Sequence, residues 1–111
     1  MAIEIRTQRK FAIKLMKKSG IDTRFKIDSF MREVELLSIF DHPHIVKLYY
    51  VNLNGEYVKK DENCKKVAYY VMELEKNSDL FDYIDLSKNF SESYARFFFV
   101  QLIKGKSYIF L

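Results

Sequence analysis

The chain has 111 residues, which is enough for one domain and too few for two. Its composition is that of a globular protein and excludes a disordered linker, because 49% of the residues are hydrophobic and only 3 are glycine and 1 is proline. The formal net charge is +4, yet acidic residues separate the basic ones and no common nucleic-acid motif is present, so we expect no nucleic-acid partner.

Membrane and secretion signals are missing from the sequence. No apolar run approaches the ~20 residues of a membrane span, and the N-terminus carries Glu4 and Arg6 where a signal peptide has its apolar run. The single Cys64 excludes an internal disulfide framework and fits a reducing compartment. We therefore expect an intracellular, cytoplasmic protein without a membrane partner. Cys64 lies in a charged stretch that predicts an exposed loop, where it is either a reactive thiol or a bystander.

The N-terminal segments 2–6 and 10–16 predict two strands of a hairpin, joined by a polar turn at 7–9. In the second strand, alternation places Lys14 on an apolar face beside Ala12 and Met16. An isolated buried charge is strongly unfavourable, so Lys14 needs an opposite charge or a ligand. The alternative is a lysine that runs along the apolar surface and leaves its ammonium in solvent.

A turn that ends at Gly20 precedes a helix that we expect to begin near Ile27 or Asp28 and to end at Phe40. Asp28 or Ser29 is its predicted N-cap. Helical spacing aligns an apolar stripe formed by Phe30, Met31, Val34, Leu37 and Phe40.

Glu33 lies within this apolar stripe. Two charges of opposite sign on apolar faces suggest that Lys14 and Glu33 meet each other or share a ligand. If the helix register differs from this prediction, Glu33 is a solvated carboxylate and Glu35 is the competing partner.

The middle of the chain predicts two more strands, at 45–53 and 67–74. Between them, Asn54-Gly55 is a strong turn signal and opens a charged loop that extends to Lys66. This loop is either a docking patch for an acidic partner or an ordinary solvated hairpin. His42 and His44 flank Pro43 in a turn and have no partners for a metal or catalytic role.

The C-terminal part predicts a short helix near 79–85 and a longer one near 92–104, capped by Ser91. The longer helix is apolar around most of its circumference, with Ala95, Phe98, Phe99, Leu102 and Ile103 on one face and Phe97 and Val100 elsewhere. Such a helix needs cover on several sides. We therefore expect the chain to be one part of a larger fold.

Several segments, in this order, resemble the eukaryotic protein kinases. Phe11-Ala12-Ile13-Lys14 resembles the Val-Ala-Ile-Lys strand, and 32–37 followed by 42–49 resembles the C-helix and the His-Pro-Asn-Ile-Val-x-Leu run after it. The segments 70–74, 79–84 and 91–105 resemble the strand before the hinge, the start of the large lobe and its long helix. Their character resembles the calcium/calmodulin-dependent serine/threonine kinases.

The resemblance implies an α+β, partial kinase-like fold with a small antiparallel sheet, one packed C-helix and two helices of an incomplete large lobe. It divides the chain into a small lobe at 1–74, a hinge at 75–78 and the start of the large lobe at 79–111. It further implies that ATP is bound, that magnesium serves only the complete kinase, and that the protein partners are a substrate or a regulator.

The resemblance also assigns roles to individual residues. Lys14 would pair with Glu33 and hold the α- and β-phosphates of ATP. The other implied ATP-binding residues are Ala12 above the adenine, Met72 at the back of its pocket, the backbone of Glu73 and Glu75 at its edge, and Asp79 at the ribose.

Two departures from the family pattern bear on activity. The 111 residues contain no Gly-x-Gly-x-x-Gly, and neither His-Arg-Asp nor Asp-Phe-Gly occurs before Leu111. Phosphoryl transfer depends on positioning and metal-assisted charge stabilisation, so we expect this chain alone to be catalytically silent. The alternatives are a non-catalytic, pseudokinase-like interaction module and a basic nucleic-acid-binding domain, whose duplex binding would depend on salt.

Overall fold

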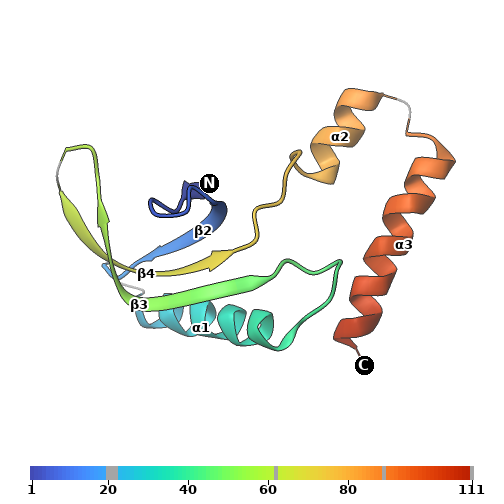
Figure 1. Ribbon diagram of the computed structural model, residues 1–111. Helices are drawn as coiled ribbons and strands as arrows, with labels where there is room; N and C mark the ends of the chain where they lie inside the picture. Colours follow the sequence, from blue (N-terminus) through green and yellow to red (C-terminus); the bar gives the residue numbers. More distant parts are fainter. Residues whose placement is uncertain (20–22, 62, 89, 111) are drawn as a thin grey trace. The chain divides into compact units, whose positions relative to one another are not determined.

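The computed structural model describes residues 1–19, 23–61, 63–88 and 90–110 (Figure 1). Within these ranges it contains a four-stranded antiparallel sheet and three helices, which confirms the predicted α+β class. The chain forms two compact units. The first comprises Met1–Ile39 and Lys47–Leu74, and the second comprises Phe40–Val46 and Glu75–Leu111. None of the helices that the structure describes is long and apolar enough to cross a membrane.

The sheet of the first unit has the strand order β1-β2-β4-β3, and every neighbouring pair is antiparallel. The strands span Ala2–Ile3 (β1), Lys10–Lys17 (β2), Leu48–Val58 (β3) and Cys64–Met72 (β4). Strand β1 is shorter than the predicted 2–6 because the chain already turns at Glu4, whose N–H donates to the carbonyl of Arg9 at 2.9 Å. The predicted hairpin is therefore present with a longer turn.

The β3–β4 hairpin corrects the predicted loop from Asn54 to Lys66. Strand β3 passes through Asn54-Gly55 without turning, and the pairing with β4 shifts in register between Asn52 and Gly55. Gly55 is buried, and a side chain there would overlap the ring of Tyr69. The glycine therefore serves a close approach at a bulge rather than a turn. Cys64 is exposed, as expected, but begins β4 instead of lying in a loop.

Helix α1, Thr23–Ile39, lies across one face of the sheet (Figure 1). It begins before the predicted start, so the predicted caps Asp28 and Ser29 lie inside the helix. The predicted start was too late because the apolar stripe is confined to the turns of α1 that pack on the sheet. The first turn faces solvent, and Phe25 in it is 74% exposed. The predicted turn at Gly20 falls outside the described residues.

The core of the first unit forms where α1 meets the sheet. Phe30 and Val34 of α1 pack against Ala68 and Tyr70 of the central strand β4. The partly buried residues around this cluster are Met16, Leu37, Leu48, Val51 and Met72. Phe30, Val34 and Leu37 of the predicted stripe therefore pack, whereas Met31 is 39% exposed and Phe40 lies beyond the end of α1 at Ile39.

The second unit contains α2, Leu80–Ser87, and α3, Glu92–Ile109. Ser91 caps α3 as predicted, since its Oγ accepts a hydrogen bond from the N–H of Tyr94. The helix continues beyond the predicted end at 104, and Gly105 lies within it. A side chain at Gly105 would stand 3.2 Å from the carbonyl oxygen of His44, so the glycine lets the 40–46 segment approach closely.

The packed face of α3 differs from the predicted one. The covered residues are Ala95, Phe98, Gln101 and Gly105, whereas Phe99 and Leu102 are exposed. Phe98 packs against the rings of Tyr83 and Phe90, at centroid distances of 5.8 and 5.9 Å. The face of α3 that packs is therefore determined by where the neighbouring segments of this unit lie, and not by the apolar pattern of the helix alone.

Candidate functional site

The candidate site begins with Lys14 in the middle of β2. Strand alternation directs Ala12, Lys14 and Met16 to the face of the sheet that α1 covers, where Met16 joins the core. The antiparallel register places Lys14 directly opposite Tyr70 on β4. The ammonium group of Lys14 is therefore brought to α1 by the pleat of the sheet.

Glu33 is the residue of α1 that Lys14 reaches. The Lys14 Nζ lies 2.8 Å from Oε1 and 2.7 Å from Oε2 of Glu33, so the ammonium bridges both carboxylate oxygens. Both side chains remain partly exposed, at 52% for Lys14 and 40% for Glu33, so the pair lies at the edge of the core and not inside it. Glu35, the competing candidate, is exposed, and its carbonyl accepts a hydrogen bond from Ser38.

Tyr70 is a component of this site that the sequence did not reveal. Its hydroxyl donates a hydrogen bond of 2.6 Å to Oε1 of Glu33, and the residue is only 1% exposed. Its ring lies 5.4 Å from that of Phe30 and 6.0 Å from the Lys14 ammonium. The only signal in the sequence was a tyrosine inside an apolar strand, since a buried tyrosine hydroxyl needs a partner.

Electrostatics fixes the protonation state of both acids at the site. The pKa of Glu33 is lowered by the hydrogen bond from Lys14, then by that from Tyr70, while desolvation opposes the shift. The pKa of Tyr70 is raised by burial and by its hydrogen bond to the Glu33 carboxylate. Glu33 is therefore an ionised acceptor, and Tyr70 a protonated donor, at neutral pH.

The residues implied for adenine binding begin beside this pair. Ala12 is the register partner of Met72, and both are half-buried. Glu73 follows β4, and its N–H donates a 2.8 Å hydrogen bond to the carbonyl of Lys47. The structure thus places Ala12, Lys14 and Met72 on adjacent strands.

Glu75 and Asp79, the other two implied ATP ligands, belong to the second unit. Asp79 is the N-cap of α2, and its Oδ1 accepts a hydrogen bond of 2.9 Å from the N–H of Asp82. Their contacts with a nucleotide stay predictions.

The described residues contain no ready-made cluster of protein ligands for a metal ion. No group of three or more His, Cys, Asp or Glu side chains in these ranges could hold a metal.

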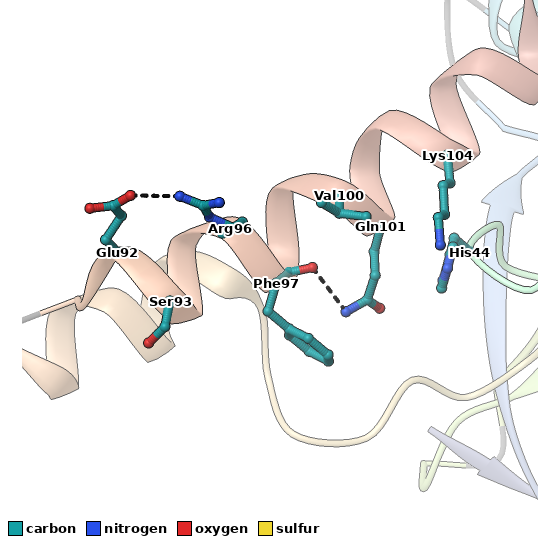
Figure 2. Close-up of a pocket in the computed structure, with 8 residues that line it drawn as sticks. All are labelled: His44, Glu92, Ser93, Arg96, Phe97, Val100, Gln101 and Lys104. Carbon is teal, nitrogen blue, oxygen red and sulfur yellow. Dashed lines mark hydrogen bonds and ion pairs between the residues drawn. The ribbon is translucent and has the colours of Figure 1, made fainter.

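A cavity of about 930 Å³ lies along α3 in the second unit (Figure 2). It is lined by His44, Glu92, Ser93, Arg96, Phe97, Val100, Gln101 and Lys104. Three of its polar side chains already have partners within the helix: Arg96 pairs with Glu92 at 2.8 Å, and Gln101 donates to the carbonyl of Phe97 at 3.3 Å. None of the implied ATP-binding residues lines this cavity.

Known proteins share this sequence pattern. The family model of the protein kinase domain matches residues 1–111. The serine/threonine-protein kinase SIK2 of Gallus gallus is 32% identical over 102 residues, which cover 92% of this chain and 11% of that protein. The 3-phosphoinositide-dependent protein kinase 1 of Homo sapiens is 30% identical over 109 residues, covering 98% of this chain and 18% of that protein.

These matches include the strand with Lys14, the helix with Glu33 and the segment after β4. The chain spans a small part of the length of these relatives, 11% to 18%. The match over its whole length, together with the Lys14–Glu33 ion pair, shows that the chain belongs to the protein kinase family.

Proposed function

We propose that this chain supplies the ATP-binding part of a protein serine/threonine kinase. In this proposal Lys14 binds the α- and β-phosphates, and Glu33 holds the Lys14 ammonium in position. The observation that carries the proposal is the bridging contact between Lys14 Nζ and both carboxylate oxygens of Glu33. The serine/threonine class is supported by the similarity to SIK2, which is named a serine/threonine-protein kinase.

Five further residues complete the proposed nucleotide site. Ala12 and Met72 contact the adenine ring, and the backbone of Glu73 and Glu75 binds its edge. Asp79 reaches the ribose hydroxyls. The pairing of Ala12 with Met72 supports the first part, since it puts two apolar side chains beside the Lys14–Glu33 pair.

We further propose that these 111 residues alone bind ATP without transferring its phosphate. Phosphoryl transfer needs a group that orients the acceptor hydroxyl and metal ions that neutralise the developing charge. The sequence contains neither His-Arg-Asp nor Asp-Phe-Gly, which supply these groups in the family. The calcium/calmodulin-dependent type, the intracellular location and a protein substrate or regulator belong to the same proposal.

Calorimetric titration of the chain with ATP tests this function. The unmodified chain should bind ATP, and Lys14→Met should weaken binding at least about tenfold through loss of a charged phosphate contact. The matched control is Lys17→Met, which removes an exposed lysine of the same strand. Equal binding by all three proteins, or none by the unmodified chain, would contradict the proposal.

A second candidate function is a non-catalytic module that binds a regulatory protein. It is favoured by the sheet face away from α1, which carries exposed apolar side chains including Ile13, Leu15 and Tyr50 around a hollow of about 930 Å³. Exposed apolar patches mark interaction sites. Light scattering after size-exclusion chromatography separates the candidates, because a monodisperse monomer at high concentration counts against this module.

A further inference from the structure

The Glu33 carboxylate accepts hydrogen bonds from two strands at once. Lys14 of β2 donates to both of its oxygens, and the Tyr70 hydroxyl of β4 donates to Oε1 at 2.6 Å. These donors differ in exposure, since Lys14 is half-exposed whereas Tyr70 is buried. The two contacts therefore have different accessibility to a ligand.

The two donors to Glu33 differ in whether a ligand can compete for them. In the proposed function the Lys14 ammonium serves phosphates as well as Glu33, so its contact with the carboxylate is shared. The Tyr70 hydroxyl is enclosed, with its ring packed against Phe30 of α1 at 5.4 Å, and it faces no such competitor. A hydrogen bond from a neutral donor to a carboxylate is also among the stronger hydrogen bonds in proteins.

We propose that Tyr70 is a positioning residue that holds Glu33 toward Lys14 through its hydroxyl. The hydroxyl fixes the rotamer of Glu33 and, with it, the rotational setting of α1 on the sheet. Lys14 can then turn to a phosphate while the carboxylate stays in place. The expected effect of Tyr70 on ATP binding rests on the proposed ATP-binding function. The hydrogen bond from Tyr70 to Glu33 does not depend on that function.

The direct test is the titration of the Glu33 carboxyl carbon, followed by NMR in the 111-residue chain. Tyr70→Phe keeps the ring and removes only the hydroxyl, and we expect the pKa of Glu33 to rise. Tyr69→Phe is the matched control, because it removes the neighbouring hydroxyl, which accepts a hydrogen bond from the Asn52 side-chain amide instead of donating one to Glu33. An unchanged Glu33 titration in Tyr70→Phe, or the same rise in both variants, would overturn the proposal.

A measurement on the unmodified chain covers the case in which Tyr70→Phe does not fold. With ring-labelled tyrosine, the Tyr70 phenol should stay protonated at a pH above the ordinary pKa of a tyrosine side chain, because its pKa is raised. Ionisation of Tyr70 in the ordinary tyrosine range would overturn the proposal. Because burial alone also raises the pKa of Tyr70, the same titration in Glu33→Gln isolates the hydrogen bond: loss of the carboxylate should lower the pKa of Tyr70 while its burial stays, and an unchanged Tyr70 titration in Glu33→Gln would also overturn the proposal.

ATP titration of the same variants separates this inference from the proposed function. Tyr70→Phe should weaken ATP binding by up to about tenfold, as one hydrogen bond to a charged group contributes on that order, whereas Tyr69→Phe should leave it unchanged. If the unmodified chain binds no ATP, the proposed function fails, while the Glu33 titration still decides the role of Tyr70. Unchanged ATP affinity in Tyr70→Phe would overturn the positioning role.

Discussion

Lys14 and Tyr70 stand directly opposite each other in the register of β2 and β4, and both donate hydrogen bonds to Glu33. A slip of either strand by one residue would turn one of these side chains to the opposite face of the sheet. The geometry of the site is therefore fixed by strand pairing as well as by the three residue types.

Replacing Glu33 by glutamine should destabilise the chain modestly. Both partners of the ion pair are about half exposed, and solvent-exposed pairs contribute roughly 0.2–1 kcal/mol. We therefore expect Glu33→Gln to lower the free energy of unfolding by about 1 kcal/mol, measured by urea titration. Glu35→Gln, on the same helix, should change it by less than about 0.5 kcal/mol. Equal losses in the two variants would speak against a specific contact at Glu33.

The lowered pKa of Glu33 predicts how stability depends on pH. Because the folded-state pKa lies below the ordinary value of 4.5, the unfolded chain binds the proton more readily. The stabilisation is therefore complete above about pH 4.5 and is lost as the pH falls through the folded-state pKa. The stability difference between the unmodified chain and Glu33→Gln should shrink on acidification over this range. A difference that stayed constant or grew would show that the charge of Glu33 is not involved.

The packing of α1 should be sensitive to truncation of Phe30 and should tolerate truncation of Phe25. Phe30 is 5% exposed in the main cluster, whereas Phe25 in the first turn is 74% exposed. Phe30→Ala should therefore cost about 3–5 kcal/mol of unfolding free energy, and Phe25→Ala less than about 0.5 kcal/mol. Chemical denaturation monitored by circular dichroism measures both, and similar costs would mean that α1 packs through another face.

Gly55 should not tolerate a side chain while Tyr69 is present. The added methyl of Gly55→Ala would overlap the Tyr69 ring, so we expect a loss of about 1–3 kcal/mol of unfolding free energy. In the background of Tyr69→Ala the same change should cost much less, because the overlapping ring is gone. Additive losses in this double-mutant cycle would place the cause in the backbone of β3 instead.

The Lys14–Glu33 contact could be anticipated from the sequence because each charge interrupts an apolar pattern of known period. Strand alternation and helical spacing independently placed the two residues on faces that had to be covered. Their remaining exposure could not be anticipated, since periodicity says which face packs and not how far the packing extends.

The roles of Tyr70 and Gly55 could not be predicted from the sequence. The partner of the Tyr70 hydroxyl depends on the register of β4 with β2 and on the rotation of α1, and neither is encoded locally. Asn54-Gly55 has the composition of a turn, but the bulk of Tyr69 across the strand pair gives the glycine a different role. The local composition predicted an irregular backbone at this position. The contact with Tyr69 made it a bulge within the strand instead of a turn.

The most direct measurement of the proposed phosphate contact is lysine labelling by an ATP acyl-phosphate. Attack by an amine near the phosphates forms an amide with the acyl group and releases ATP, and mass spectrometry identifies the modified lysine. We predict acylation of Lys14 that excess ATP suppresses, with Lys17 of the same strand reacting weakly and independently of ATP. Labelling of Lys14 no stronger than that of Lys17, or unaffected by ATP, would contradict the placement of nucleotide phosphates at the Lys14–Glu33 pair.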